Sequence, residues 1–116
     1  MKLKDIVKEF GLEVKAGPGH LDQEVTGGYV SDLLSDVLAH AEDGNIWVTL
    51  HIHQNIVAVA AHKGLCGIIL VQGRDPEKDT VAKAEEEGIP IMVSSLSAFE
   101  LVGRLYKAGI RGAEAD

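Results

Sequence analysis

Three short apolar segments constrain the fold of this chain more than any other feature of its sequence. They are IWVTL at 46–50, GIILV at 67–71 and IPIMV at 89–93. Each segment is rich in β-branched residues and nearly free of polar ones, which is typical of strands covered on both faces of a sheet. Segments of helix length separate them, and such connections favour parallel neighbours. We therefore expect a three-layer α/β/α domain with a mainly parallel sheet.

Apolar spacing predicts helices before and between these strands. The first helix begins near Leu3 and ends at Gly11, and a half-buried strand follows from Leu12. We interpret 17–28 as irregular. The next helix is predicted from Ser31, its N-cap, to a stop at Gly44. Its apolar stripe consists of Leu33, Leu34, Val37, Leu38 and Ala41.

The later helices have clearer end signals. The segment 55–63 is predicted to be a helix buried nearly all round, and a further helix is predicted up to Gly88. Asp75 and Pro76 stand in the order of a cap followed by a first helical residue. Ser97 and Glu100 have the spacing of a capping box for the last helix. The tail from 111 to 116 is expected to fray.

Length and charge limit the class of protein. The chain has 116 residues and a net charge of −7, so we expect one domain spanning 1–116. The absence of a Lys/Arg cluster argues against binding to nucleic acids or anionic membranes. The single cysteine, Cys66, lies in an apolar run and is predicted to be a buried, inert thiol, as suits the cytoplasm. No apolar run reaches membrane-spanning length.

A candidate ligand site follows from the predicted sheet. Ligands of open parallel sheets bind outside the carboxyl ends of the strands, where loops and helix N-termini converge. The candidate residues there are His51, His53, Gln54, Asn55, Gln72, Gly73, Arg74, Asp75, Ser94 and Ser95. Polar residues are also what an ordinary strand-to-helix connection uses, and Asn55 and Asp75 occupy positions suited to N-caps. Both interpretations remain open from the sequence.

The histidines and the sequence motifs give no sign of a metal site or of catalysis. His51 and His53 are two apart and would point to the same side of an extended segment, but a stable zinc site needs three or four ligands. We therefore predict no metal and no cofactor. The sequence contains neither a G-x-S-x-G elbow nor a P-loop, and we do not expect an enzyme.

The segment EVTGG at 24–28 lies before a predicted helix. Adjacent glycines there could approach a phosphate, but no Lys or Arg accompanies them and Glu24 and Asp32 make the surroundings anionic. Gly27 and Gly28 are better interpreted as serving a tight turn or close packing against a neighbouring chain.

At these residues the chain resembles the DRTGG domain family. Thr26, Gly27 and Gly28 match the motif that names the family, whereas Glu24 and Val25 replace its Asp and Arg. The segments GGYVSDLLSDVL, WVTLHIHQNIVAVA, GIILVQG and AEEEGIPIMVSSLSAFELVGRLYKAGI look like the rest of the family pattern, so the resemblance covers about 20–110.

The resemblance implies an α/β/α module without its own chemistry. The family module is related to the N-terminal domain of HPr kinase/phosphorylase. It also accompanies CBS-domain pyrophosphatases and phosphate acetyltransferases, and occurs as short proteins linked to iron-hydrogenase clusters. No catalytic residue is carried over. We accordingly expect a regulatory or assembly module that forms a homodimer or docks on a partner enzyme. The alternative is a sensor of a nucleotide or anionic metabolite.

Overall fold

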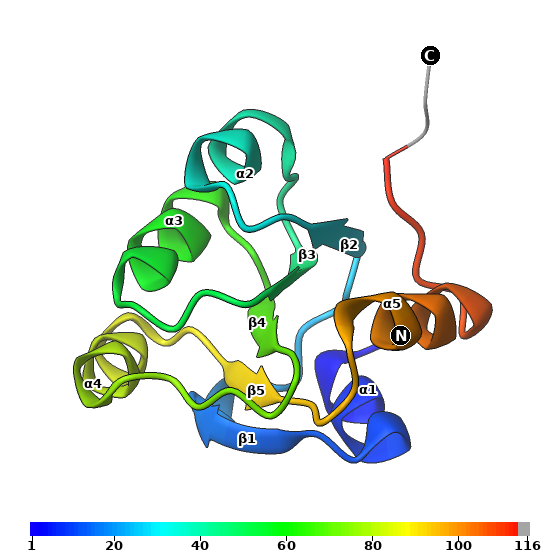
Figure 1. Ribbon diagram of the computed structural model, residues 1–116, viewed down its shortest axis with the longest axis horizontal. Coiled ribbons are helices and arrows are strands. Elements are labelled where there is room, and N and C mark those ends of the chain that lie inside the picture. The colour runs from blue at the N-terminus through cyan, green and yellow to red at the C-terminus, as the bar shows by residue number, and fades with distance from the viewer. Residues whose placement is uncertain (114–116) are drawn as a thin grey trace.

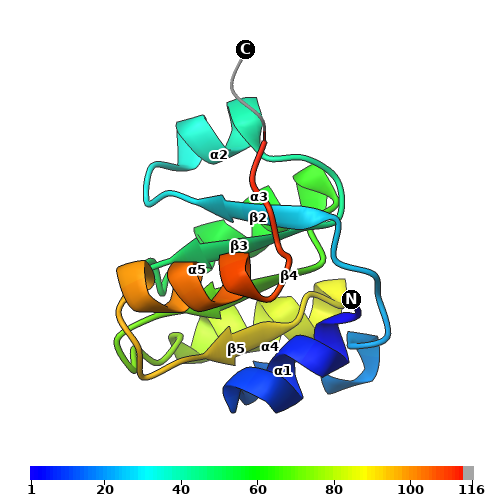
Figure 2. The same ribbon diagram turned by 90° about the vertical axis from the view of Figure 1, so that its right-hand side faces the viewer.

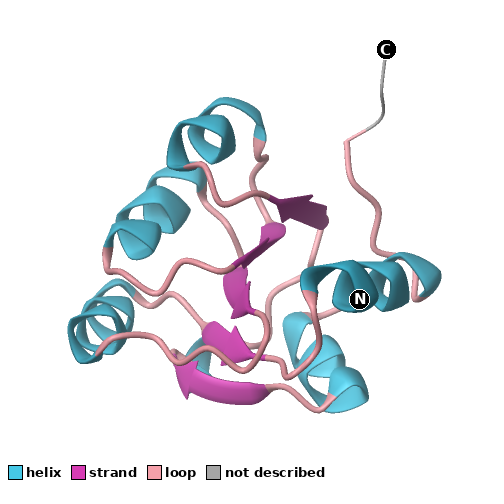
Figure 3. Ribbon diagram, in the orientation of Figure 1, coloured by secondary structure: helices cyan, strands magenta, loops and turns pink. Residues whose placement is uncertain are grey.

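The chain folds around one five-stranded sheet whose order is β1-β5-β4-β3-β2 (Figures 1 and 3). The computed structural model describes residues 1–113. The strands are β1 (Glu13–Ala16), β2 (Gly27–Val30), β3 (Asn45–Thr49), β4 (Gly67–Leu70) and β5 (Ile91–Val93). β2, β3, β4 and β5 run parallel, and β1 pairs antiparallel with β5 at the edge. The predicted mainly parallel sheet is therefore confirmed.

Helices cover both faces of this sheet (Figure 2). One face carries α2 (Leu34–His40), α3 (Asn55–Lys63) and α4 (Lys78–Glu87), whereas the other carries α1 (Leu3–Phe10) and α5 (Ala98–Lys107). A short 3-10 turn, Pro18–His20, follows β1. The three-layer arrangement agrees with the prediction. None of the helices within residues 1–113 is long and apolar enough to cross a membrane.

The two faces of the sheet form separate cores because side chains alternate along a strand. In β3, Trp47 packs with the cluster under α2, α3 and α4, while Ile46 and Val48 pack with the cluster under α1 and α5. All five residues of β3 are buried, as its apolar composition predicts. β4 and β5 are likewise buried throughout.

The prediction for 17–28 is wrong at its end, because Gly27 and Gly28 begin strand β2 and form no tight turn. Close packing does explain Gly27, but within one chain. A Cβ on Gly27 would lie 2.7 Å from the carbonyl oxygen of Arg111. The N–H of Gly28 donates to that same oxygen at 3.0 Å. The part of the predicted frayed tail at Arg111 is thus held against β2, and residues 114–116 lie outside the described residues.

The helix predicted from Ser31 begins later, at Leu34, with Leu33 as its N-cap. The reason is a contact distant in sequence: the carboxylate of Asp32 accepts hydrogen bonds from Thr49 and Leu50 at the end of β3. This contact holds 31–33 along the sheet. Leu33 remains 64% exposed and Leu38 42%, so the predicted apolar stripe is buried only in part.

The N-caps of α3 and α4 also differ from the predicted positions, by one and two residues. Gln54, and not Asn55, is the N-cap of α3, and Glu77, and not Asp75, is that of α4. Asp75 instead forms an ion pair with Lys15 at 3.1 Å. The helix α3 has an exposed side that includes Ala58 and Ala61, so the prediction of burial nearly all round is wrong.

The N-cap predicted for α5 is confirmed, whereas only half of the predicted capping box forms. The Ser97 hydroxyl accepts from the N–H of Glu100 at 3.3 Å, as an N-cap does. The return bond of a capping box is absent within the described residues, because the Glu100 carboxylate pairs with Arg104 at 3.2 Å. At the other end Gly109 has φ 108° and the N–H of Ile110 donates to Leu105 at 2.9 Å.

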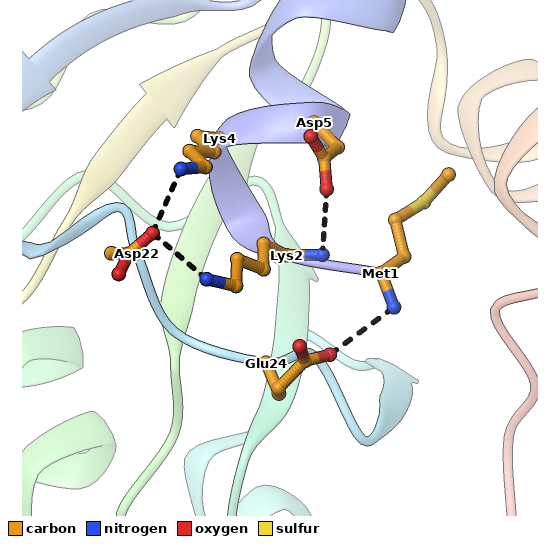
Figure 4. Close-up of polar contacts among 6 residues, drawn as sticks. All are labelled: Met1, Lys2, Lys4, Asp5, Asp22 and Glu24. Atoms are coloured by element: carbon orange, nitrogen blue, oxygen red, sulfur yellow. Dashed lines mark hydrogen bonds and ion pairs between the residues drawn. The ribbon is translucent and has the colours of Figure 1, made fainter.

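Ion pairs attach the N-terminus to the segment before β2 (Figure 4). The ammonium groups of Lys2 and Lys4 lie 3.2 and 2.9 Å from the carboxylate of Asp22. The terminal amino group of Met1 lies 3.3 Å from Glu24. Hydrogen bonding, from Lys4 first, lowers the pKa of Asp22. This anchor fixes the acidic segment on the amino-end side of the sheet.

Candidate functional site

A pocket lies where the parallel strands β2, β3 and β4 end. Its volume is ≈ 250 Å³ and it is lined by Asp32, Leu50, His51, Ile52, His53 and Arg74. Asp32 follows β2, the four residues 50–53 follow β3, and Arg74 follows β4. The site therefore occupies the position at which open parallel sheets bind ligands.

Asp32 links the loops on either side of the pocket. One of its carboxylate oxygens, Oδ1, accepts from the hydroxyl of Thr49 and from the N–H of Leu50, both at 2.8 Å. Its backbone carbonyl contacts Nε2 of His51. The second carboxylate oxygen, Oδ2, makes no hydrogen bond within residues 1–113. It remains available as an acceptor at the wall of the pocket.

The two histidines of the predicted site both line the pocket, but a different ring nitrogen of each is free of hydrogen bonds to the described residues. A carbonyl oxygen only accepts, so Nε2 of His51 carries a proton toward Asp32, and Nδ1 is the acceptor of the neutral ring. In His53 the roles are reversed. Its Nδ1 accepts from the N–H of Asn55 at 3.1 Å, which leaves the proton of the neutral ring on Nε2.

Arg74 supplies a cation. Its side chain is exposed and forms no ion pair with another described residue. The preceding turn is tightly held: Gln72 donates to the carbonyl of Leu96 and Gly73 to that of Ser94, both at 2.8 Å. Gln72 has φ 59°, a left-handed conformation that is uncommon outside glycine. The turn fixes the point from which Arg74 extends.

The structure separates the other predicted site residues from the pocket. Gln54 and Asn55 begin α3, Gln72 and Gly73 form the turn, and Asp75 faces Lys15. Ser94 is buried, and its hydroxyl accepts from the N–H of Leu96 at 3.1 Å. Ser95 is exposed beside it. Among the ten predicted residues the pocket brings together three: His51, His53 and Arg74.

The motif loop 26–28 lies at the other end of the sheet, because it starts the parallel strand β2. The Thr26 hydroxyl donates to the carbonyl of Asp43 at 2.8 Å and accepts from Asn45 at 3.2 Å. These bonds join β2 to the turn before β3. The contacts of Thr26, Gly27 and Gly28 are thus structural ones within the chain.

The cysteine and the placement of possible metal ligands limit the chemistry that the described residues can perform. Burial raises the pKa of the Cys66 thiol to about 12, so at neutral pH it is protonated and a poor nucleophile. Within residues 1–113 no three His, Cys, Asp or Glu side chains gather in a way that could hold a metal ion.

An apolar groove forms a second candidate site. It lies between α5 and β2, on the face of the sheet that carries α1 and α5. Its volume is ≈ 560 Å³, and its lining consists of Val30, Ala98, Phe99, Val102, Gly103 and Tyr106. Phe99 is 90% exposed, Tyr106 56% and Val30 47%. We call these six residues the α5–β2 groove. Contiguous exposed apolar surface of this kind marks interaction sites in soluble proteins.

Comparisons with known proteins support the fold and leave the function to be tested. No protein-family model matches the chain, and no curated protein does. Among solved structures, the CBS and DRTGG domains of the regulatory region of Clostridium perfringens pyrophosphatase, complexed with the activator diadenosine tetraphosphate, match with a TM-score of 0.66 and 14% identity. The match covers 87% of this chain and 44% of that one. The chain therefore has a DRTGG-like α/β fold and spans less than half of that regulatory region.

Proposed function

We propose that this chain is a non-catalytic, DRTGG-like regulatory module of one domain that acts as a homodimer, through the α5–β2 groove. The observation that carries the proposal is the nearly complete exposure of Phe99, an apolar side chain, in an apolar groove. Exposure of a phenylalanine to water is unfavourable, and aromatic residues are enriched in the centres of protein interfaces.

A second copy of the chain suits this surface by its charge. Helix α5 carries Glu100 in its first turn and Arg104 and Lys107 in its last. If two α5 helices packed antiparallel about a two-fold axis, Glu100 of each copy would face Lys107 of the other. Such pairing is isologous, as in most homodimers, and it also opposes the helix dipoles. The net charge of −7 would repel two copies elsewhere on the surface.

The edge of the sheet lies beside the groove. Within residues 1–113, β2 has a strand neighbour on one side only, and the tail at Arg111 pairs with it at Gly28 but not beyond. Val30, at the exposed end of this edge, also lines the groove. An unprotected strand edge is a template for pairing with another chain, so this edge also favours a second copy of the chain as the partner.

Light scattering on the purified chain tests the proposal. We expect a mass of twice 12.4 kDa at micromolar concentration, and a shift to the monomer mass in Phe99→Asp. Phe99 is exposed in the single chain, so the variant should retain its circular dichroism spectrum. Leu33→Asp, with the same charge change at an exposed leucine outside the groove, is the control and should remain a dimer.

Three outcomes would contradict the proposal. A wild-type monomer would exclude a second copy, so that a partner enzyme would be the remaining occupant. A dimer that survived Phe99→Asp, or one that Leu33→Asp dissociated, would place the interface elsewhere.

A second candidate function is a small-ligand sensor, favoured by the position of the pocket at the strand ends. The similar regulatory region is described with a nucleotide activator bound, which adds support to a nucleotide or anionic metabolite as the ligand. Binding to the native state raises the melting temperature by mass action. We expect at least one compound of a nucleotide and metabolite screen to raise it, and a flat screen would contradict this function.

A further inference from the structure

The pocket at the strand ends offers acceptors as well as donors to a ligand. Its free donors are the guanidinium of Arg74 and Nε2 of His53, and its free acceptors are Oδ2 of Asp32 and Nδ1 of His51. We propose that the pocket binds a small phosphate monoester that carries free hydroxyl groups, of which a pentose phosphate is the simplest. This inference names the ligand class for the sensor function and rests on it.

The phosphate is assigned to the Arg74 side of the pocket. A guanidinium presents a planar fork of N–H groups that matches phosphate oxygens with two hydrogen bonds. Arg74 pairs with no carboxylate among residues 1–113, so no internal partner has to be displaced. Nε2–H of His53, from the neighbouring loop, can donate to the same anion.

The hydroxyl groups are assigned to the Asp32 side. A simple anion would be repelled by the Asp32 carboxylate, and a simple cation would be repelled by Arg74. A hydroxyl group, in contrast, can donate to a carboxylate oxygen while its neighbour donates to the ring nitrogen of His51. The second oxygen of Asp32 is free for this role because Thr49 and Leu50 both bind the first one.

The size of the pocket limits the ligand to a few carbon atoms. Pockets for drug-sized molecules have volumes of about 300–1,000 Å³, and this one is slightly smaller at ≈ 250 Å³. Leu50 and Ile52 supply the apolar part of its lining, against which the carbon skeleton of a sugar can lie. The pocket therefore suits one sugar and one phosphate better than a longer molecule.

Thermal shift and NMR titrations of the full chain with ribose 5-phosphate test the inference. We expect the melting temperature to rise at millimolar ligand and the amide signals of 50–53 to move. Arg74→Gln should weaken binding by about ten- to a hundredfold, since it removes charged hydrogen bonds. Arg104→Gln removes an arginine of α5 that does not line the pocket, so this variant should bind like the wild type.

Asp32→Asn separates the two halves of the assignment. The variant keeps the oxygen that binds Thr49 and Leu50 but replaces the free oxygen with an N–H₂ group. It should weaken binding of ribose 5-phosphate. The weaker binding of inorganic phosphate should not be reduced and should become tighter, because the variant removes the charge that repels a simple anion. Ribose alone should give no shift.

Two results would overturn the inference, and neither of them bears on the homodimer proposal. No response to ribose 5-phosphate, or equal binding by Arg74→Gln, would contradict it. If other compounds of the screen bound in that case, the sensor function would stand with another ligand class. If none did, the sensor function would fail as well. The dimer is measured separately by light scattering and does not depend on either result.

Discussion

Ile69→Ala is expected to lower the free energy of unfolding by about 2–5 kcal/mol. Ile69 is fully buried in β4, the central strand of the sheet, where it faces the core beneath α1 and α5. The substitution removes three carbon atoms from a close-packed site and leaves a cavity that the neighbouring strands cannot fill. Urea unfolding followed by circular dichroism measures the change.

Leu33→Ala is the control for this prediction because it shortens an aliphatic side chain that is 64% exposed. Its effect should stay within about 0.5 kcal/mol. A loss at Ile69 as small as that at Leu33 would show that β4 is not the buried centre of the sheet. A large loss at Leu33 would restore the continuous stripe that the sequence predicts for α2.

Gly17→Ala is expected to be comparably damaging, for a reason of backbone geometry. Gly17 has φ 66°, and a Cβ there would lie 2.8 Å from Cα of Pro90 and 2.9 Å from the carbonyl carbon of Ile89. A methyl group would thus press on the backbone of the segment that leads into β5. Strain and overpacking each cost about 1–3 kcal/mol, so we expect a loss of about 2–6 kcal/mol in urea unfolding.

Gly11→Ala provides the matched control. Gly11 has φ 60° at the end of α1, and a Cβ there would meet nothing within 4 Å. The variant incurs only the cost of placing alanine in the left-handed conformation, which is about 1–2 kcal/mol. The difference between the two variants therefore measures the contact with Pro90 and Ile89. Equal losses would contradict the close approach of β1 and β5 at Gly17.

The strands that the sequence predicts best are those whose evidence is local. The segments 46–50, 67–71 and 89–93 are nearly free of polar residues because helices cover both faces, and composition alone reveals this. The cap at Ser97 is also local, since its partner is three residues away. Strand β2 is missed for the opposite reason. Two of its four residues are glycine, and its stability depends on pairing with β3 and with the tail at Arg111.

Part of the candidate site could be predicted because local sequence evidence identifies the strands that position it. His51, His53 and Arg74 follow strands that the sequence identifies, so their convergence follows from the parallel topology. The sequence places Asp32 in a helix because its partner Thr49 lies 17 residues away, a contact that no local pattern signals. Recognition of β2 as a fourth parallel strand would have placed Asp32 at the same edge.

The α5–β2 groove could not be predicted from spacing alone. Helix α5 has apolar residues on two sides: Leu101 and Leu105 are buried against the sheet, whereas Phe99 and Tyr106 face outward. Sequence periodicity shows that apolar residues recur, but only the position of the helix on the sheet shows which of them remain uncovered. This outward side is the basis of the proposed homodimer.

Cross-linking at Gly103 tests that proposal most directly. An antiparallel pairing that sets Glu100 opposite Lys107 of the second copy has its centre beside Gly103, where a Cβ meets nothing within 4 Å. Cys66 is buried, with its pKa raised to about 12, so the thiol of Gly103→Cys is the one that reacts. Glu86→Cys, exposed on α4 across the sheet, is the control. With a short bismaleimide we expect a covalent dimer of Gly103→Cys and none of Glu86→Cys. Failure of Gly103→Cys to cross-link, or equal cross-linking of both variants, would contradict the α5–β2 homodimer.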